Sequence, residues 1–139
     1  MSRSGYKRLI VAFAVVSTAF CLFAIAYSQW LNPRVIEELR SNPNGERAQK
    51  VMILTLPSGK VRPVNYLRDG RSIYAAADFP WWRELDGGSQ HATAWIKGET
   101  LDGTIRAVTD DPALRDSVFE RLRPTAPRWA GTLVVITLD

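Results

Sequence analysis

A short basic and aromatic segment is the part of this sequence best suited to bind a ligand. Lys60 and Arg62 follow a glycine turn and stand two positions apart in an expected strand, so both side chains lie on one face. Two cations on one face can hold a phosphate group. The same pair is also typical of a strand edge that its charges keep soluble. The spacing therefore predicts either a phosphate site or a solvated strand edge.

Three further residues could complete such a site. The amide of Asn65 could hydrogen-bond the edge of a ring, or else pair with backbone; in a regular strand it faces away from Arg62 unless Pro63 introduces a bulge. Trp81 and Trp82 could wall an aromatic slot or a lipophilic pocket, although such residues also anchor short helices in a core. The candidate cofactor-binding residues are therefore Lys60, Arg62, Asn65, Trp81 and Trp82.

One cysteine and one histidine limit the other kinds of chemistry. Cys21 has no partner for a disulfide within the chain. His91 stands outside any cluster of Cys, His and carboxylates with metal-ligand spacing, so we expect no metal site. No serine lies in the surroundings of a nucleophile elbow. The sequence therefore gives no signature of metal or nucleophilic catalysis, and it names no catalytic residue.

A long uncharged segment precedes these candidates. No charged residue occurs from Leu9 to Pro33, and a spanning helix needs roughly 20 mostly apolar residues. Tyr27 and Trp30 stand where interfacial aromatic residues usually lie. We expect a single-pass anchor in membrane lipid through residues 9–31. A cleaved signal peptide and a buried core helix are the alternatives, but the run is longer than a typical signal core.

The charge distribution argues against nucleic acid as a partner. Of the 18 basic residues, Arg3, Lys7 and Arg8 precede the apolar run, and the remaining 15 lie beyond Leu31 with all 14 acidic residues. The part after the run is therefore nearly neutral, whereas nucleic-acid binding needs basic residues concentrated on one face. The N-terminal cluster favours a cytoplasmic N-terminus. Basic residues on the other side weaken that bias, namely Arg34, Arg40, Arg47 and Lys50.

The period of the apolar residues changes after the run. We expect three parts: residues 1–31 as basic N-terminus and anchor, 32–46 as a short helix and linker, and 47–139 as a barrel domain. Alternating or apolar stretches predict six strands, at 50–56, 60–67, 72–77, 90–97, 104–109 and 132–138. The Asp-Gly pairs 69–70 and 102–103 predict turns between strands.

Two short helices complete the expected elements. Pro80 opens one that runs to Leu85, with Asp78 as its cap, and Asp111 caps another that runs from Pro112 to about Arg123. Mainly hairpin connections indicate a mainly β, α+β domain. We therefore predict a six-stranded antiparallel split β-barrel with helices over its openings, preceded by one transmembrane helix.

The order of these motifs resembles a known superfamily. Ser58-Gly59-Lys60-x-Arg62, then Pro63-Val64-Asn65-Tyr66 and the Asp69-Gly70 hairpin, is similar to the flavin-binding split β-barrel proteins, which include the pyridoxamine-phosphate-oxidase-like proteins. The Pro-Trp-Trp helix, the strand ending Ala107-Val108-Thr109-Asp110 and the later helix and strand look closer to the deazaflavin-dependent nitroreductases. The resemblance covers about Arg47 to Leu138.

This resemblance implies an oxidoreductase whose cofactor carries the chemistry. The implied cofactor is deazaflavin (coenzyme F-420), or alternatively FMN, with no metal. The implied acceptor is a nitro compound, a quinone or a similar lipophilic small molecule, which an anchor would bring close to the barrel. Split barrels of this type often form a homodimer.

The chain departs from the family pattern on the cofactor side. Arg62 adjoins Pro63 without the usual spacer, and the loop Ala77-Asp78-Phe79 is short. Two alternatives therefore stand beside the enzyme: a non-catalytic module that binds a flavin-like ligand, heme or lipid, and a membrane-attached interaction module with a degenerate barrel. An open groove beside the tryptophans favours ligand binding, whereas a filled one favours the interaction module.

Overall fold

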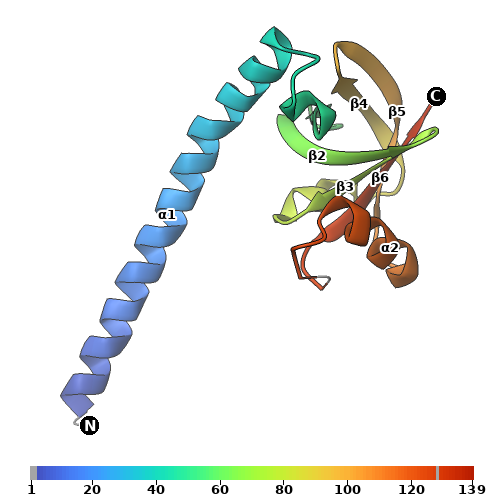
Figure 1. The fold of residues 1–139 in the computed structure, drawn as a ribbon. Helices are drawn as coiled ribbons and strands as arrows, with labels where there is room; N and C mark the ends of the chain where they lie inside the picture. The colour runs from blue at the N-terminus through green and yellow to red at the C-terminus, as the bar shows by residue number, and fades with distance from the viewer. Residues whose placement is uncertain (1–2, 128) are drawn as a thin grey trace. The chain divides into compact units, whose positions relative to one another are not determined.

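The computed structural model describes residues 3–127 and 129–139, which divide into two compact units after Val35. Figure 1 shows the order of the elements, with the long helix α1 (Arg3–Ser41) followed by a β-barrel. The units follow from packing. The division into an anchor (residues 1–31), a helix and linker (32–46) and a barrel domain (47–139) rests on the sequence pattern, and it stays a prediction.

Helix α1 is long and apolar enough to cross a membrane, by length and composition. In the first unit its apolar side chains are exposed, and an aromatic row follows one side: the rings of Phe23 and Tyr27 stack with centroids 6.0 Å apart, and Arg34 lies 3.7 Å above Trp30. The sequence predicted a separate helix from Asn32. Instead α1 runs through Pro33 without a break.

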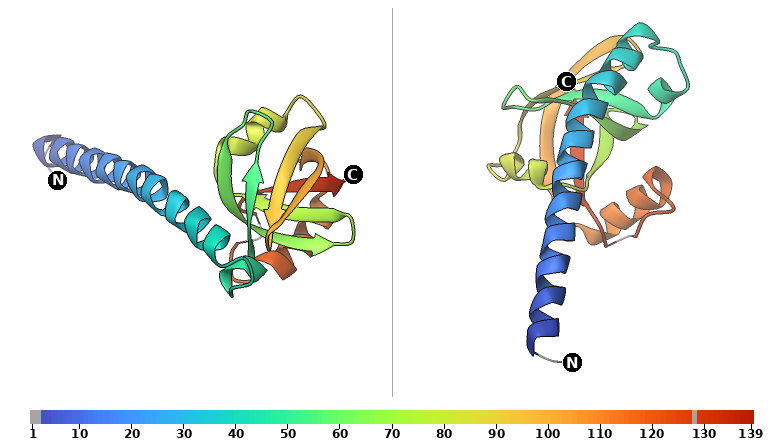
Figure 2. Two further views of the ribbon diagram at one scale, coloured as in Figure 1. Left: turned by 90° about the horizontal axis from the view of Figure 1, so that it is seen from above. Right: turned by 90° about the vertical axis from the view of Figure 1, so that its left-hand side faces the viewer.

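The second unit is a closed antiparallel barrel (Figure 2). Its strands stand in the order β1-β2-β3-β6-β5-β4. The six-stranded antiparallel barrel that the sequence predicted is confirmed. The strands are β1 (Val51–Thr55), β2 (Val61–Asp69), β3 (Ser72–Ala77), β4 (Gln90–Ile96), β5 (Glu99–Val108) and β6 (Thr132–Leu138). Strands β1 and β4 pair at three positions only, from Ile53↔Trp95 to Thr55↔Thr93, so the barrel opens beyond Thr55.

Alternation along the strands fills the barrel with apolar side chains. On β3, Ile73, Ala75 and Ala77 point inward, and on β4 Ala92 and Ala94 do so. The same interior cluster contains larger apolar residues, namely Met52, Leu54, Ile105, Val134 and Ile136. The inner core is therefore apolar, and it reaches the barrel end that a short helix covers.

Strand β5 begins five residues earlier than the sequence indicated. The expected Asp102-Gly103 turn is wrong, because the β4–β5 hairpin turns at Lys97 and Gly98, which both have positive φ. Gly103 is instead buried inside the strand, between Ala92 and Leu138. A Cβ atom there would lie 2.4 Å from the carbonyl oxygen of Thr137. The glycine therefore serves the close approach of two strands.

The two helical segments occupy different places on the barrel. The 3₁₀ helix η2 (Pro80–Leu85) packs against the inner core through Leu85, Trp81 and Trp82. Helix α2 (Pro112–Leu122) was expected over an opening, but Val118 and Phe119 pack on outward-facing residues of β3, β5 and β6. The outer face is apolar at these positions, so α2 completes a second core outside the barrel.

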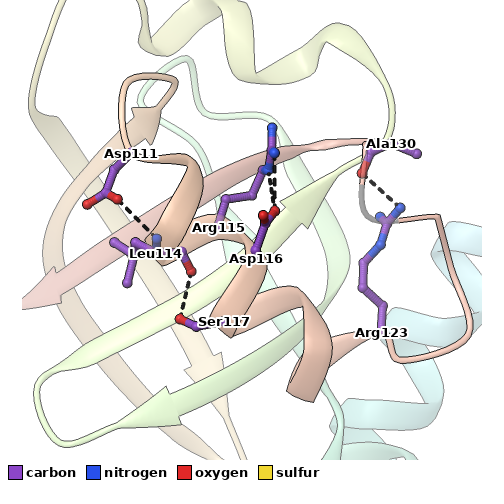
Figure 3. Close-up of polar contacts among 7 residues, drawn as sticks. All are labelled: Asp111, Leu114, Arg115, Asp116, Ser117, Arg123 and Ala130. Carbon is purple, nitrogen blue, oxygen red and sulfur yellow. Dashed lines mark hydrogen bonds and ion pairs between the residues drawn. The ribbon is translucent and has the colours of Figure 1, made fainter.

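The helix caps differ as well. Asp111 caps α2 as expected, because its carboxylate accepts a hydrogen bond of 3.0 Å from the backbone amide of Leu114 (Figure 3). The expected cap of η2 is wrong, since Phe79 precedes η2 without a side-chain cap. The carboxylate of Asp78 instead accepts a hydrogen bond from Arg123, which lies 45 residues later in the chain.

Candidate functional site

Strand β2 directs Arg62 toward the barrel end beneath η2. Arg62 pairs with Leu54 in the β1–β2 register and shares the inward face of β2 with Val64 and Tyr66. Its guanidinium carbon lies 5.2 Å from the ring centroid of Trp81, within the range of a cation–π contact. The cation is thus held between the barrel interior and an aromatic lid.

Burial shapes the electrostatics of this arginine. Burial lowers the pKa of the Arg62 guanidinium, and the nearby carboxylate of Glu84 acts in the opposite direction. The Nε atom of Arg62 is buried and has no hydrogen-bond partner among the residues that the structure describes. A buried donor without a partner costs free energy, because it has lost water without replacement. Arg62 therefore has an N–H group that could donate a hydrogen bond to an anion.

Helix η2 supplies the aromatic part of the site. Pro80 stands in its first turn, where a missing backbone amide is tolerated, and Leu85 fixes its end in the core. The indoles of Trp81 and Trp82 are partly buried against the inner core. Arg83 lies 6.0 Å from the ring centroid of Trp82. Both tryptophans therefore belong to the packing of the barrel end, and each also faces an arginine.

Two polar contacts hold η2 to the strands. The hydroxyl of Ser58, in the β1–β2 turn, donates to the Glu84 carboxylate at 2.9 Å from its Oε1 and lies 3.1 Å from its Oε2. The side-chain amide of Gln90 donates to the Glu84 carbonyl oxygen at 2.9 Å. Sequence reasoning missed Glu84 and Gln90 as members of the site. One indication was present in the sequence: Ser58 belongs to the Ser-Gly-Lys-x-Arg motif, and Glu84 belongs to the predicted helix from Pro80 to Leu85.

The structure brings some of the predicted residues together and separates others. Arg62, Trp81 and Trp82 meet at one end of the barrel. Lys60 is exposed immediately before β2, and its backbone carbonyl accepts a hydrogen bond from Leu56. Asn65 is exposed on the outer face of β2, opposite Val51. The register passes through Pro63 without a bulge, so Asn65 and Arg62 face opposite ways.

A pocket of about 360 Å³ lies where β1 and β4 stop pairing. Pro57 adjoins Ser58 in sequence, and Gln90 holds the backbone of Glu84, so the pocket neighbours the contacts of η2. Its polar residues include His91, whose Nε2 lies 3.7 Å from Asp102, and Thr93, which donates to the same carboxylate at 2.7 Å. The lining residues are Thr55, Leu56, Pro57, Gln90, His91, Ala92 and Thr93.

The arrangement is suited to binding rather than to proton transfer. It combines a half-buried cation that has a donor to spare, two aromatic rings and a neighbouring pocket. Within residues 3–127 and 129–139, no three His, Cys, Asp or Glu side chains gather as metal ligands. Such a site can hold an anionic group beside an aromatic or apolar one.

The fold is shared with a solved structure. A crystal structure of a candidate pyridoxamine 5'-phosphate oxidase from Listeria innocua superposes with a TM-score of 0.54 at 15% identity, over 67% of this chain and 88% of that chain. The six-stranded barrel of this chain therefore has the fold of that structure. No family model and no curated protein matches the sequence. The likeness therefore shows the architecture, and the function has to be argued from the residues.

Proposed function

We propose that this chain is a membrane-anchored oxidoreductase whose barrel binds deazaflavin (coenzyme F-420) or FMN and reduces a nitro, quinone or similar lipophilic acceptor. The observation that carries the proposal is the half-buried Arg62, whose Nε has no partner among the described residues and whose guanidinium lies over Trp81. A phosphate oxygen would accept a hydrogen bond from that N–H, and its negative charge would neutralise the cation.

The residues fit the anionic end of such a cofactor. Lys60 stands two positions before Arg62, at the exposed start of β2, where it can add a second cation to a phosphate. Trp81 and Trp82 present aromatic surface next to the cation, which suits the ring of a flavin-type cofactor. Asn65 lies on the other face of β2, so the proposed contacts are those of Lys60, Arg62, Trp81 and Trp82.

When bound, the cofactor would supply the hydride or electron transfer to the acceptor. The chain's own residues would bind and orient it: Arg62 and Lys60 its phosphate, and the two tryptophans its ring. The contact between Ser58 and Glu84 would keep η2 closed over the barrel end and limit the access of water. Residues 9–31, as an anchor in lipid, would raise the local concentration of a lipophilic acceptor.

The test is a binding titration of the full chain, held in nanodiscs, with FMN and with coenzyme F-420. We expect saturable binding of one of them, and we expect Arg62→Ala and Lys60→Ala to weaken it. Arg106→Ala is the matched control, because Arg106 is an exposed cation on β5. Binding that Arg62→Ala leaves unchanged would contradict the proposed site, even if a cofactor binds elsewhere.

A second candidate is a non-catalytic module that binds a ligand or a protein at the membrane. The packing of both tryptophans against the inner core favours it, because that packing fills part of the space beside Arg62. Oxidation by quinone of the purified, reduced, cofactor-loaded chain separates the two candidates. Turnover supports the enzyme, whereas a folded chain that binds neither cofactor supports the module.

A further inference from the structure

Two aromatic side chains on separate loops are largely exposed. Phe79, between β3 and η2, exposes 68% of its surface, and Trp129, before β6, exposes 81%. Large aromatic residues usually bury most of their surface in a folded chain. We call Phe79 and Trp129 the aromatic pair. Their exposure calls for an external partner, because neither ring contributes to a core cluster.

The pairing of β3 with β6 places both loops at the same end of the barrel. The ladder ends at Ala77↔Thr132, so Phe79 follows its last pair by two residues, and Trp129 precedes it by three. Gly131 turns with a φ of 87°, and a Cβ there would lie 3.2 Å from the Asp78 carboxylate. The two loops therefore run side by side.

Arg123 fastens the two loops together. Its guanidinium donates to the Asp78 carboxylate. It also donates, at 3.1 Å, to the carbonyl oxygen of Ala130 (Figure 3). The Arg123 side chain is only 15% exposed, and its ring contact is with Phe119 of α2. The neighbours of both aromatic residues are thus bound to one largely buried side chain, which ties the two loops together.

Basic residues flank the aromatic pair in sequence. Residues 121–129, RLRPTAPRW, contain three arginines and no acidic residue, and the third, Arg128, lies outside the described residues. Arg83 is exposed four residues after Phe79. The one acidic residue beside Phe79, Asp78, is already paired with Arg123. Exposed aromatic rings with arginines around them match a surface that has anionic headgroups above and acyl chains below.

We propose that the aromatic pair docks the barrel on an anionic lipid surface. Phe79 and Trp129 enter the headgroup region, and the exposed Arg83 and Arg121 contact lipid phosphates. The apolar helix α1 makes a bilayer the surface at hand. A second copy of the chain fits less well, because it would bring arginines against arginines. Docking does not depend on cofactor binding, but Phe79 adjoins η2, so it would bring the candidate site to the lipid.

The test labels the full chain at position 129 with an environment-sensitive fluorophore. The variant Trp129→Cys is made in a Cys21→Ser background and reconstituted in vesicles of phosphatidylcholine and phosphatidylglycerol. The matched control is His91→Cys, whose exposed position lies on β4. We expect spin-labelled lipid to quench the label at 129 at least twofold more than the label at 91. In vesicles of phosphatidylcholine alone, we expect a smaller difference in quenching between the labels at 129 and 91.

A second substitution tests the pair itself. Phe79→Ser should reduce the quenching at 129, whereas Val61→Ser, which removes another exposed apolar side chain, should leave it unchanged. Equal quenching at 129 and 91 overturns the proposal, as does a chain that fails to float with vesicles. A blue shift at 129 that depends on protein concentration and resists lipid quenching indicates a second copy instead, and it also overturns the proposal.

Discussion

The guanidinium of Arg62 lies over the indole of Trp81, 5.2 Å from guanidinium carbon to ring centroid, at the end of an otherwise apolar barrel. A cation on the inward face of a strand lowers the free energy of unfolding, because it loses water. Here the Nε of Arg62 is also buried without a partner in the described part of the chain. Proteins keep such costly groups mainly where they bind something. We therefore expect Arg62 to contribute to ligand binding and not to the stability of the barrel.

Arg62→Met should remove ligand binding without harm to the fold. Methionine keeps most of the apolar stem and its contact with Trp81, and it removes a desolvated donor. We expect the free energy of unfolding to stay equal or to rise by about 1 kcal/mol. Chemical denaturation of both proteins measures it, with Arg106→Met on the exposed face of β5 as control. A loss of about 2 kcal/mol would show that Arg62 stabilises the barrel.

Tyr66 should make the stability of the barrel depend on pH in the alkaline range. Burial raises the pKa of its phenol above the ordinary value of 10.0, and Arg68 opposes this more weakly. The folded chain therefore keeps a proton that the unfolded chain releases. This contribution is fully present below about pH 10, and it is lost as pH rises further.

Tyr66→Phe isolates that effect. The variant loses the hydrogen bond of 3.3 Å from the Tyr66 hydroxyl to the Ala48 carbonyl, at a cost of about 1 kcal/mol at neutral pH. The fall in stability above pH 10 should then be shallower than in the parent. Urea midpoints at neutral pH and above pH 10 give the comparison. A parent and a variant with the same slope would rule out Tyr66 as the titrating group.

Gly103→Ala should destabilise the barrel strongly. The added Cβ would meet the Thr137 carbonyl oxygen at 2.4 Å and the side chain of Ile136 at 3.1 Å, so β5 and β6 would have to separate. We expect a loss of about 1–3 kcal/mol, the usual range for overpacking. Gly87→Ala is the control, because among the described residues its Cβ would have only Gln90 within 4 Å, at 3.8 Å. Thermal unfolding of the two variants should differ clearly in midpoint.

Gly103 also shows where the sequence pattern was insufficient. Strands β3 and β6 were predicted at their observed bounds, because both are uninterrupted apolar or alternating runs between clear turn residues. The pair Asp102-Gly103 has the composition of a turn, yet the turn is formed by Lys97 and Gly98. The glycine is needed because two strands approach each other there, and a tertiary contact of this kind leaves no local signal.

The candidate site was predicted only in part, because it too depends on tertiary contacts that leave no local signal. Alternation correctly set Arg62 and Asn65 on opposite faces of β2. The partners of the site come from distant segments: Ser58 meets Glu84 across 26 residues, and Asp78 meets Arg123 across 45. Asp78 had the position of a helix cap, but a charged guanidinium is a stronger partner than a backbone amide. Only the folded barrel determines which partner is within reach.

Asp111→Ala should destabilise α2 and loosen the outer core. The Asp111 carboxylate accepts from the Leu114 amide at 3.0 Å, and the loss of an N-cap of this kind costs about 1 kcal/mol. Asp110→Ala is the matched control, since it removes an exposed carboxylate one residue earlier and should change stability by less than about 0.5 kcal/mol. Chemical denaturation measures both.

Hydrogen exchange locates the effect of the missing cap. Val118 and Phe119 on α2 pack against the outward faces of β3, β5 and β6, outside the inner core. A weaker α2 should therefore exchange faster across residues 112–122, while the backbone amides of β4, whose side chains Ala92 and Ala94 face the inner core, keep their protection. Equal loss of protection in α2 and β4 would mean that the outer core does not open independently of the barrel.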